Sequence, residues 1–203
     1  MKLLGVIGVI VLVLMSFRAK ADDVKFADDK SCVAWKTRKT LFLFKHVEPV
    51  GMNCAVQSIV LNKGSELRLR SVIPINKFDS GEPSRDKEVF NILGGDRQTE
   101  IIYTSGPVDE AAIKNMLAAP ADMLGLIYVN SKAFPVHFLV SAKTVEGGVA
   151  FDGHCTTKFS DLEIPKIKVA GGLIASVDDY LELHFHLLSS QIEKFPPALI
   201  QGL

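Results

Sequence analysis

Apolar and polar residues alternate in short runs along most of the chain, the pattern of β-strands with one buried face. The clearest run is 66–75, in which Leu67 and Leu69 face one way and Arg68 and Arg70 face the other. The same reasoning predicts strands at 33–35, 40–47, 54–61, 100–104, 125–130, 134–144, 149–159 and 180–188.

Two segments interrupt the alternation with helical spacing. Segment 84–93 stops at Gly94-Gly95, a common helix end, and segment 108–119 lies between Pro107 and Pro120. About eight strands with short connections and no β-α-β rhythm predict an all-β fold, an antiparallel sheet that either closes into a barrel or splits into a sandwich.

The stretch 78–86 reads as a structural turn that opens the first helix. Gly81 allows a backbone conformation that other residues resist, Ser84 can cap the helix, and Asp86 in the first turn complements the helix dipole. Arg85 is expected either to pair with an acid at the end of the sheet or to contact the polar head of a ligand.

The N-terminus has the order of features that is typical of a secretory signal peptide. Lys2 precedes an unbroken apolar run over 3–15, and Ala19-Lys20-Ala21 forms an A-x-A cleavage pattern. The apolar run is shorter than the ~20 residues that a membrane-spanning helix needs, although an uncleaved N-terminal anchor is the alternative. We therefore expect a signal peptide at 1–21, one domain at 22–203, periplasmic localisation and no stable membrane insertion.

Charge and cysteine content limit the partners and the disulfides that we expect. The chain has 23 basic and 23 acidic residues, and loss of Lys2, Arg18 and Lys20 on cleavage would leave 23 − 3 = 20 basic residues and a net charge of −3. The basic residues form no stripe, so nucleic acid is not an expected partner. In an oxidising compartment, Cys32, Cys54 and Cys155 allow one disulfide and one free thiol, or three buried thiols.

Five segments in order resemble the YceI-like family. The stretch 78–86 (FDSGEPSRD) resembles that family's turn before an Arg-Asp helix start, and 42–46 (FLFKH) resembles its early strand. The other three are 125–138, 160–162 and 177–187, so that the resemblance spans 35–188. It implies an extended antiparallel barrel, similar to lipocalins, that holds an isoprenoid or fatty-acyl lipid in a central tunnel.

The resemblance also implies which residues face the tunnel. Strand alternation would place His46 there as a rare polar group, beside an almost wholly apolar wall. A filled core of the same residues is the alternative, because the sequence cannot distinguish it from a lined tunnel. The residues expected to bind the ligand are Phe42, Phe44, His46, Arg85, Ile127, Val129, Phe138, Val140, Leu183 and Phe185, with Leu67, Leu69, Val136 and Leu181 on the same face.

The remaining histidines suggest a rival function. His184 and His186 lie two apart on one strand, and His154 lies on a neighbouring one, so a metal-dependent enzyme is the main alternative. Because the opposite face of that strand is apolar, we expect both strand histidines to point to solvent. His154 and Cys155 are adjacent on a strand and face opposite ways, so they cannot act as a base and nucleophile.

The function expected from the sequence is a periplasmic carrier or scavenger of a long apolar lipid. The sequence contains no G-x-S-x-G, G-x-x-x-x-G-K or HExxH motif, so neither an enzyme nor a cofactor is expected. A filled barrel that acts only through protein partners is a further alternative, and the oligomeric state is left open.

Export is the first testable prediction. The protein recovered from the periplasmic fraction should begin at Asp22, as measured by intact mass. Protein found in the cytoplasm with residues 1–21 still attached would show that the segment is not a cleaved signal.

Overall fold

The structure is a computed structural model that describes residues 24–41, 45–63, 66–165, 168–169 and 175–200. Within these ranges no helix is long and apolar enough to cross a membrane. The helices are α1 (Pro83–Ile92) and α2 (Glu110–Ala118), with short 3₁₀ turns η1 (Ile75–Lys77), η2 (Ser160–Leu162), η4 (Ser189–Gln191) and η5 (Pro197–Leu199). The strands are β1 (Cys32–Leu41), β2 (Lys45–Val47), β3 (Val50–Asn53), β4 (Gln57–Lys63), β5 (Glu66–Pro74), β6 (Glu100–Val108), β7 (Ala121–Val129), β8 (Lys132–Val145), β9 (Gly148–Thr157), β10 (Lys168–Val169), β11 (Ala175–Leu188) and β12 (Ile192–Glu193).

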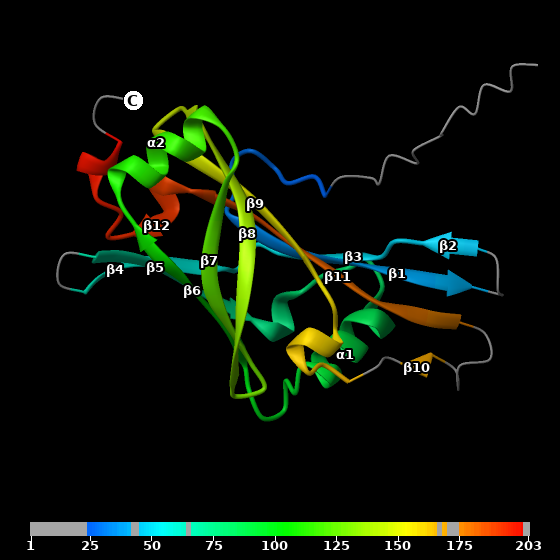
Figure 1. Cartoon of the computed structure of the whole chain (residues 1–203). Coiled ribbons are helices and arrows are strands. Elements are labelled where there is room, and N and C mark those ends of the chain that lie inside the picture. Colours follow the sequence, from blue (N-terminus) through cyan, green and yellow to red (C-terminus); the bar gives the residue numbers. More distant parts are fainter. Residues whose placement is uncertain (1–23, 42–44, 64–65, 166–167, 170–174, 201–203) are drawn as a thin grey trace, which may run out of the picture.

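All the strands in the described part of the chain belong to one strongly curved, mostly antiparallel sheet (Figure 1). Its order is β12-β4-β5-β6-β7-β8-β9-β11-β1-β2, with β3 on β1 and β10 on β11. Eight of these strands have seven or more residues, namely β1, β4, β5, β6, β7, β8, β9 and β11. The predicted all-β barrel of about eight strands with one or two short helices is therefore confirmed.

The sheet does not close through its own hydrogen-bond ladder. The two sides approach where Met52 of β3 and Asp79, just before α1, form an antiparallel bridge with N–O distances of 2.8 Å in both directions. Asn53 adds a hydrogen bond of 2.7 Å from Nδ2 to the carbonyl oxygen of Pro74 at the end of β5. These main-chain and amide contacts hold β3 against the end of β5 and the segment that follows it.

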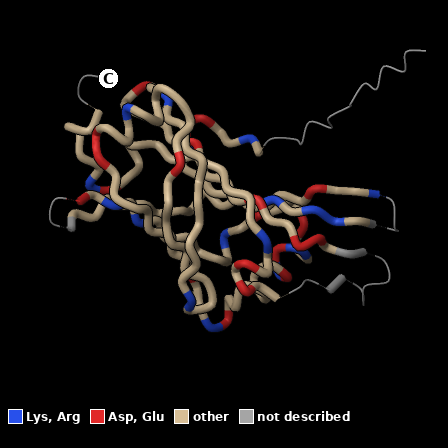
Figure 2. The backbone as a smooth tube through the Cα atoms, in the orientation of Figure 1, with Lys and Arg blue, Asp and Glu red and all other residues tan. Residues whose placement is uncertain are grey.

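Strict alternation on β7 and β8 explains the core. On β7, Met123, Gly125, Ile127 and Val129 are buried, and the residues between them are exposed. On β8 the buried residues alternate in the same way through Phe138. Because neighbouring side chains in a strand point to opposite faces, this pattern turns one apolar face inward. Figure 2 shows that the middle of both strands is nearly free of charged residues.

The prediction of a single strand over 40–47 is wrong. β1 ends at Leu41 and β2 runs back along it, with Thr40 opposite His46. The run contains no Gly, Pro, Asn or Asp, the residues that usually mark a turn, so its apolar β-formers read as a continuous strand. Phe42 and Phe44, two of the expected ligand contacts, lie outside the described residues.

The two helices cover opposite ends of the sheet (Figure 1). α2 has Asp109 as its N-cap, with Oδ1 accepting from the backbone N–H of Ala112 at 2.7 Å, and buries Ile113 and Met116. α1 has Glu82 as its N-cap, so the predicted cap role of Ser84 is wrong. The Ser84 hydroxyl donates instead to the Glu82 carboxylate at 2.8 Å.

Cys32 and Cys54 form a disulfide, and Cys155 is a buried free thiol. The bridge links the start of β1 to the residue that follows β3, across 22 positions of sequence. It thereby adds a covalent link between β1 and the end of β3, its antiparallel neighbour. Of the two arrangements that the sequence left open, the structure has one disulfide and one free thiol.

We predict that loss of this disulfide destabilises the fold. Removing a crosslink over a loop of this size costs about 3 kcal/mol in the free energy of unfolding. Cys54→Ser should show that loss in urea denaturation under oxidising conditions. Reductant should then lower the stability of the wild type to the level of the variant and leave the variant unchanged. A variant as stable as the oxidised wild type would contradict this account.

Candidate ligand cavity

The interior of the barrel contains a cavity of about 360 Å³ between α1 and the sheet. Its volume lies in the ~300–1,000 Å³ range of small-molecule sites in proteins. Its wall is almost entirely apolar and draws on strands from opposite sides of the sheet. The apolar lining residues are Trp35, Pro49, Phe78, Val89, Ile92, Leu93, Ile101, Ile127, Val129, Phe159, Leu162, Ile164, Val177, Leu181 and Leu183.

Four charged side chains are among the residues that line this cavity. Lys39 of β1 and the α1-side residues Glu82, Arg85 and Glu88 line its margin, and both glutamates are exposed. The Ser84 hydroxyl and the Arg85 guanidinium hold the pKa of Glu82 below its ordinary value. The cavity therefore combines a mostly apolar lining with a rim of Lys, Arg and Glu side chains.

The turn before α1 sets the position of this rim. Asp86 Oδ1 accepts from the backbone N–H and the hydroxyl of Ser80, at 2.9 and 2.6 Å. Gly81 has a φ of +73°, the left-handed conformation that glycine tolerates, and its N–H donates to Asp79 Oδ1 at 2.8 Å. Arg85 donates to Glu82 Oε2 at 2.5 Å, which confirms its predicted pairing with an acid.

Aromatic rings interrupt the interior beyond the main cavity. Phe138 packs edge-on against Tyr103 with ring centroids 5.4 Å apart, and its ring is 5.2 Å from that of Phe185. A space of about 70 Å³ lies at this belt, and another of about 50 Å³ lies beyond it, under α2. The interior is thus a lined cavity at the α1 end and a nearly filled core at the α2 end.

The described residues of the predicted ligand set divide among these spaces. Ile127, Val129, Leu183 and Arg85 line the main cavity. Ile127, Phe138, Leu183 and Phe185 line the middle space, and Val140 and Phe185 line the small one. Strand alternation thus placed the inward side chains of β7, β8 and β11 correctly, and their contact with a ligand stays a prediction.

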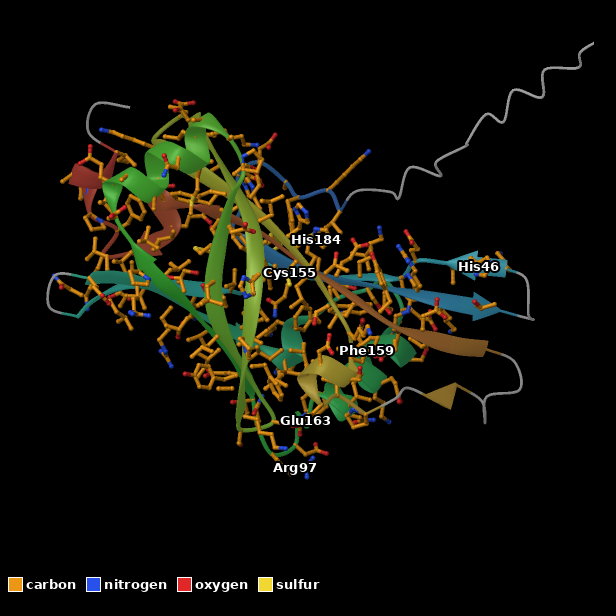
Figure 3. All side chains as sticks on the ribbon, viewed as in Figure 1. His46, Arg97, Cys155, Phe159, Glu163 and His184 are labelled. Carbon is orange, nitrogen blue, oxygen red and sulfur yellow. A yellow bond between two sulfur atoms is a disulfide. The ribbon has the colours of Figure 1, made fainter. Side chains whose placement is uncertain are left out.

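His46 does not lie in the interior. Its side chain is exposed on β2, where Nδ1 is 3.1 Å from the hydroxyl of Thr40 on β1. Figure 3 shows His46 on the projecting end of the sheet, far from Cys155 at its centre. The inward position predicted for His46 is wrong because it assumed a single strand where the chain forms a hairpin.

Sequence reasoning missed most of the α1 side of the cavity. Trp35 and Phe78 line both the main cavity and the middle space, and Val89, Ile92 and Leu93 approach from α1. The apolar spacing of α1 identified its buried face but not the surface that the face covers. Trp35 is the only tryptophan in the chain, which could have marked it as a residue of interest.

Comparison with solved structures identifies the fold. The structure superposes on Burkholderia cenocepacia BcnA with a TM-score of 0.57 and 16% identity, over 77% of this chain and 94% of that one. It superposes on a polyisoprenoid-binding domain from Saccharophagus degradans, implicated in plant cell wall breakdown, with a TM-score of 0.52, 14% identity and the same coverage. The fold is YceI-like.

No family model and no curated protein matches the sequence. A Campylobacter jejuni YceI protein superposes with a TM-score of 0.47 and 9% identity, over 90% of this chain and 96% of that one. At these identities the comparisons establish the fold alone.

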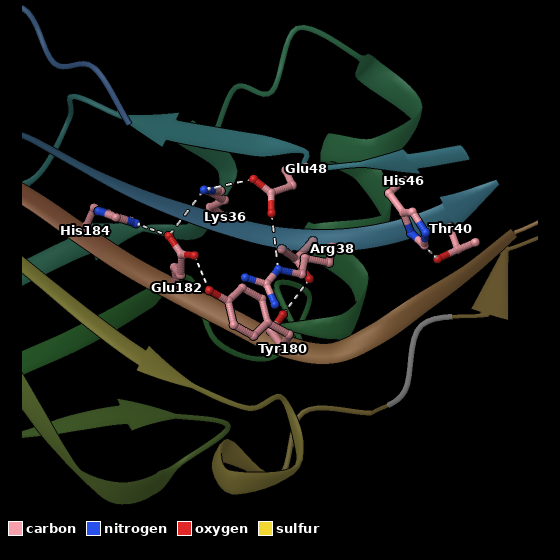
Figure 4. A network of polar contacts seen from close by, with 9 residues as sticks. Lys36, Arg38, Thr40, His46, Glu48, Tyr180, Glu182 and His184 are labelled. Atoms are coloured by element: carbon pink, nitrogen blue, oxygen red, sulfur yellow. Dashed lines mark hydrogen bonds and ion pairs between the residues drawn. The ribbon is translucent and has the colours of Figure 1, made fainter. Parts of the chain in front are cut away.

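The outer face of this YceI-like barrel holds a polar network that the sequence did not predict (Figure 4). Lys36 of β1 is only 1% exposed and pairs with Glu48 at 3.0 Å and with Glu182 at 3.6 Å. His184 Nε2 lies 3.0 Å from Glu182 Oε2, and its side chain is 17% exposed. Arg38 lies over the ring of Tyr180, 3.7 Å from the ring centroid.

The predicted solvent exposure of His184 and His186 is wrong. His186 is 2% exposed, lies 2.6 Å from Asp152 through Nδ1, and stacks on Phe26 with ring centroids 6.0 Å apart. The segment before β1 covers this part of the outer face, and Gln191 holds the segment by accepting from the N–H of Ser31 and donating to the carbonyl of Asp29. Strand alternation gave the face correctly, but alternation does not show which part of that face another segment covers.

The histidines do not form the metal site of the rival hypothesis. His154 stacks on His184 with ring centroids 6.3 Å apart, whereas His186 pairs with Asp152. Among the described residues no group of three or more His, Cys, Asp or Glu side chains could hold a metal ion. His154 is exposed and Cys155 is buried, so these neighbours face opposite ways as predicted.

We predict that acidification destabilises the fold through this network. Burial lowers the pKa of His184, with partial compensation by Glu182. Burial opposes ionisation of Glu182, but hydrogen bonds from Tyr180 and His184 and the charge of Lys36 lower its pKa overall. A histidine with a lowered pKa loses stability as the pH falls below its unfolded value of 6.5, and Glu182 follows as the pH falls through its lowered value.

The free energy of unfolding, measured by urea denaturation at each pH, should therefore decline below about pH 6.5. His184→Gln should flatten the first part of this decline. His46→Gln is the matched control, because His46 is exposed, and should leave the profile unchanged. Equal profiles for His184→Gln and the wild type would remove His184 from the account.

Proposed function

We propose that this protein binds one long apolar lipid, of the polyisoprenoid or fatty-acyl class, inside its barrel and acts as a carrier or scavenger without covalent chemistry. The observation that carries the proposal is the apolar cavity of about 360 Å³ with its charged margin. A YceI-like fold shared with a polyisoprenoid-binding domain supports the same conclusion.

The physical driving force is transfer of hydrocarbon from water. Each buried methylene contributes ~0.8 kcal/mol, so a chain that buries about eight of them gains roughly 6 kcal/mol before the cost of ordering. Such binding needs no specific polar contact along the chain, which suits a wall as apolar as this one. The ionised rim formed by Lys39, Glu82, Arg85 and Glu88 would remain in water and meet the polar end of the lipid.

We further propose that the protein works in the periplasm. Two observations support this location: the signal-peptide pattern over 1–21 and the disulfide between Cys32 and Cys54. Disulfides of this kind persist in oxidising compartments and are rare in the cytosol. A lipid crossing this aqueous space requires a container that shields its chain from water, which the barrel would provide.

A matched pair of substitutions on β7 tests the proposal. Ile127 is 8% exposed and faces the cavity, whereas its neighbour Leu126 is 40% exposed and faces outward. Ile127→Asp places an unpaired carboxylate in the apolar wall and should abolish lipid retention. Leu126→Asp introduces the same charge on the outer face and should retain it.

The measurement is organic extraction of the purified proteins followed by mass spectrometry, with a thermal melt to confirm folding. The proposal requires a lipid in the wild type and in Leu126→Asp at similar occupancy. Ile127→Ala serves as a second inward variant if Ile127→Asp does not fold. A folded Ile127→Asp that carries the same lipid, or a wild type that neither carries nor takes up lipid, would overturn the proposal.

A further inference from the structure

Two buried polar atoms at the middle of the barrel have no hydrogen-bond partner in the described part of the protein. They are Tyr103 Oη and Trp35 Nε1. Tyr103 is 7% exposed and Trp35 is 9% exposed, and both side chains line the middle space of about 70 Å³. Because nearly all buried polar groups in proteins are paired, each unpaired one requires a specific explanation.

The residues packed against these two atoms leave little room for a protein group that could accept a hydrogen bond from either of them. A Cβ added at Gly125 would lie 2.5 Å from Tyr103 Oη, and one added at Gly51 would lie 2.5 Å from Trp35 Nε1. Each aromatic ring therefore lies against a glycine of a neighbouring strand, which offers no side chain to accept a hydrogen bond. The Ser71 hydroxyl also lines the space, but it pairs with the Ser58 hydroxyl at 2.8 Å. This arrangement also keeps the bulk of both rings along the wall and leaves the space between them open.

Tyr103 is held in the form that donates. Burial, followed by the proximity of the Cys155 thiol, raises the pKa of Tyr103 well above its ordinary value, so the phenol is protonated. Trp35 Nε1 can only donate. Both atoms are therefore hydrogen-bond donors that lack an acceptor.

The acceptor must be neutral. The residues that line the middle space include no Lys, Arg, Asp or Glu. His184 borders the space, but its Nε2 pairs with Glu182 in the outer network, and burial lowers the pKa of this histidine. A phosphate or carboxylate here would be a buried charge without a counter-charge, which is strongly disfavoured. Charged groups are matched instead at the rim, where Lys39 and Arg85 lie.

We propose that the ligand is a lipid with a carbonyl-type acceptor, such as a ketone, quinone, ester or amide oxygen, which lies at the aromatic belt and accepts from Tyr103. Trp35, which lines both this space and the main cavity, supplies the second donor on the ligand's path. The inference rests on the proposed lipid-binding function and adds selection among lipids: a carbonyl-bearing chain is preferred to a plain hydrocarbon of equal length.

The test compares a long-chain ketone with the alkane of equal length, using the emission of Trp35 to report binding. The wild type should favour the ketone by about fivefold, or ~1 kcal/mol, the net value of one buried hydrogen bond. Tyr103→Phe removes only the hydroxyl and should abolish this preference by weakening ketone binding. Tyr128→Phe is the matched control because Tyr128 is 38% exposed, and it should keep the preference.

Each of the other possible results would contradict either this inference or the proposed function. Equal binding of the ketone and the alkane by the wild type would mean that no ligand acceptor meets Tyr103, as when water fills the middle space, and would overturn the inference while leaving lipid binding intact. The same holds if Tyr103→Phe keeps the wild-type preference. If the wild type binds neither compound, the proposed function itself fails.

Discussion

The hydrogen-bond ladder of the curved sheet does not close, and the Met52–Asp79 bridge is the main-chain contact that joins β3 to the segment following β5. The residues that follow Asp79 form the turn that anchors α1, through Ser80 and Asp86. The contact that joins these two parts of the sheet therefore also positions α1, which lines the main cavity. Loss of this bridge would affect both the stability of the sheet and the shape of the ligand space.

The interior is packed differently at the two ends of the barrel. Under α2 the interior is nearly filled, with Ile113 fully buried and a space of only about 50 Å³ left. Under α1 the apolar wall encloses about 360 Å³. Dense packing is the normal state of a protein interior, so this large unfilled apolar space is the feature that most distinguishes a container from a core. Folding stability can come from the filled end while the open end accepts a ligand.

Strand alternation predicted much of this structure, because it depends only on local geometry. The inward positions of Ile127, Phe138 and Phe185 follow directly from the period of two. Two features that strand alternation did not reveal have a common cause: His186 is covered by the N-terminal segment that carries Phe26, and the buried Lys36 pairs with Glu182 of β11. Contacts between segments far apart in sequence leave no periodic signal. The hairpin that moved His46 out of the interior was missed because its sequence lacks the usual turn residues.

The central claim is that the cavity beside Trp35 contains the apolar chain of a lipid. The chain has one tryptophan, 9% exposed and in the cavity wall, so its emission reports this site alone. The most direct measurement is titration with a lipid that is brominated along its chain, because bromine quenches tryptophan only at close range. The account predicts saturable quenching of Trp35 that an excess of the unbrominated lipid reverses. Emission that the brominated lipid leaves unchanged, in a folded protein stripped of endogenous lipid, would contradict it.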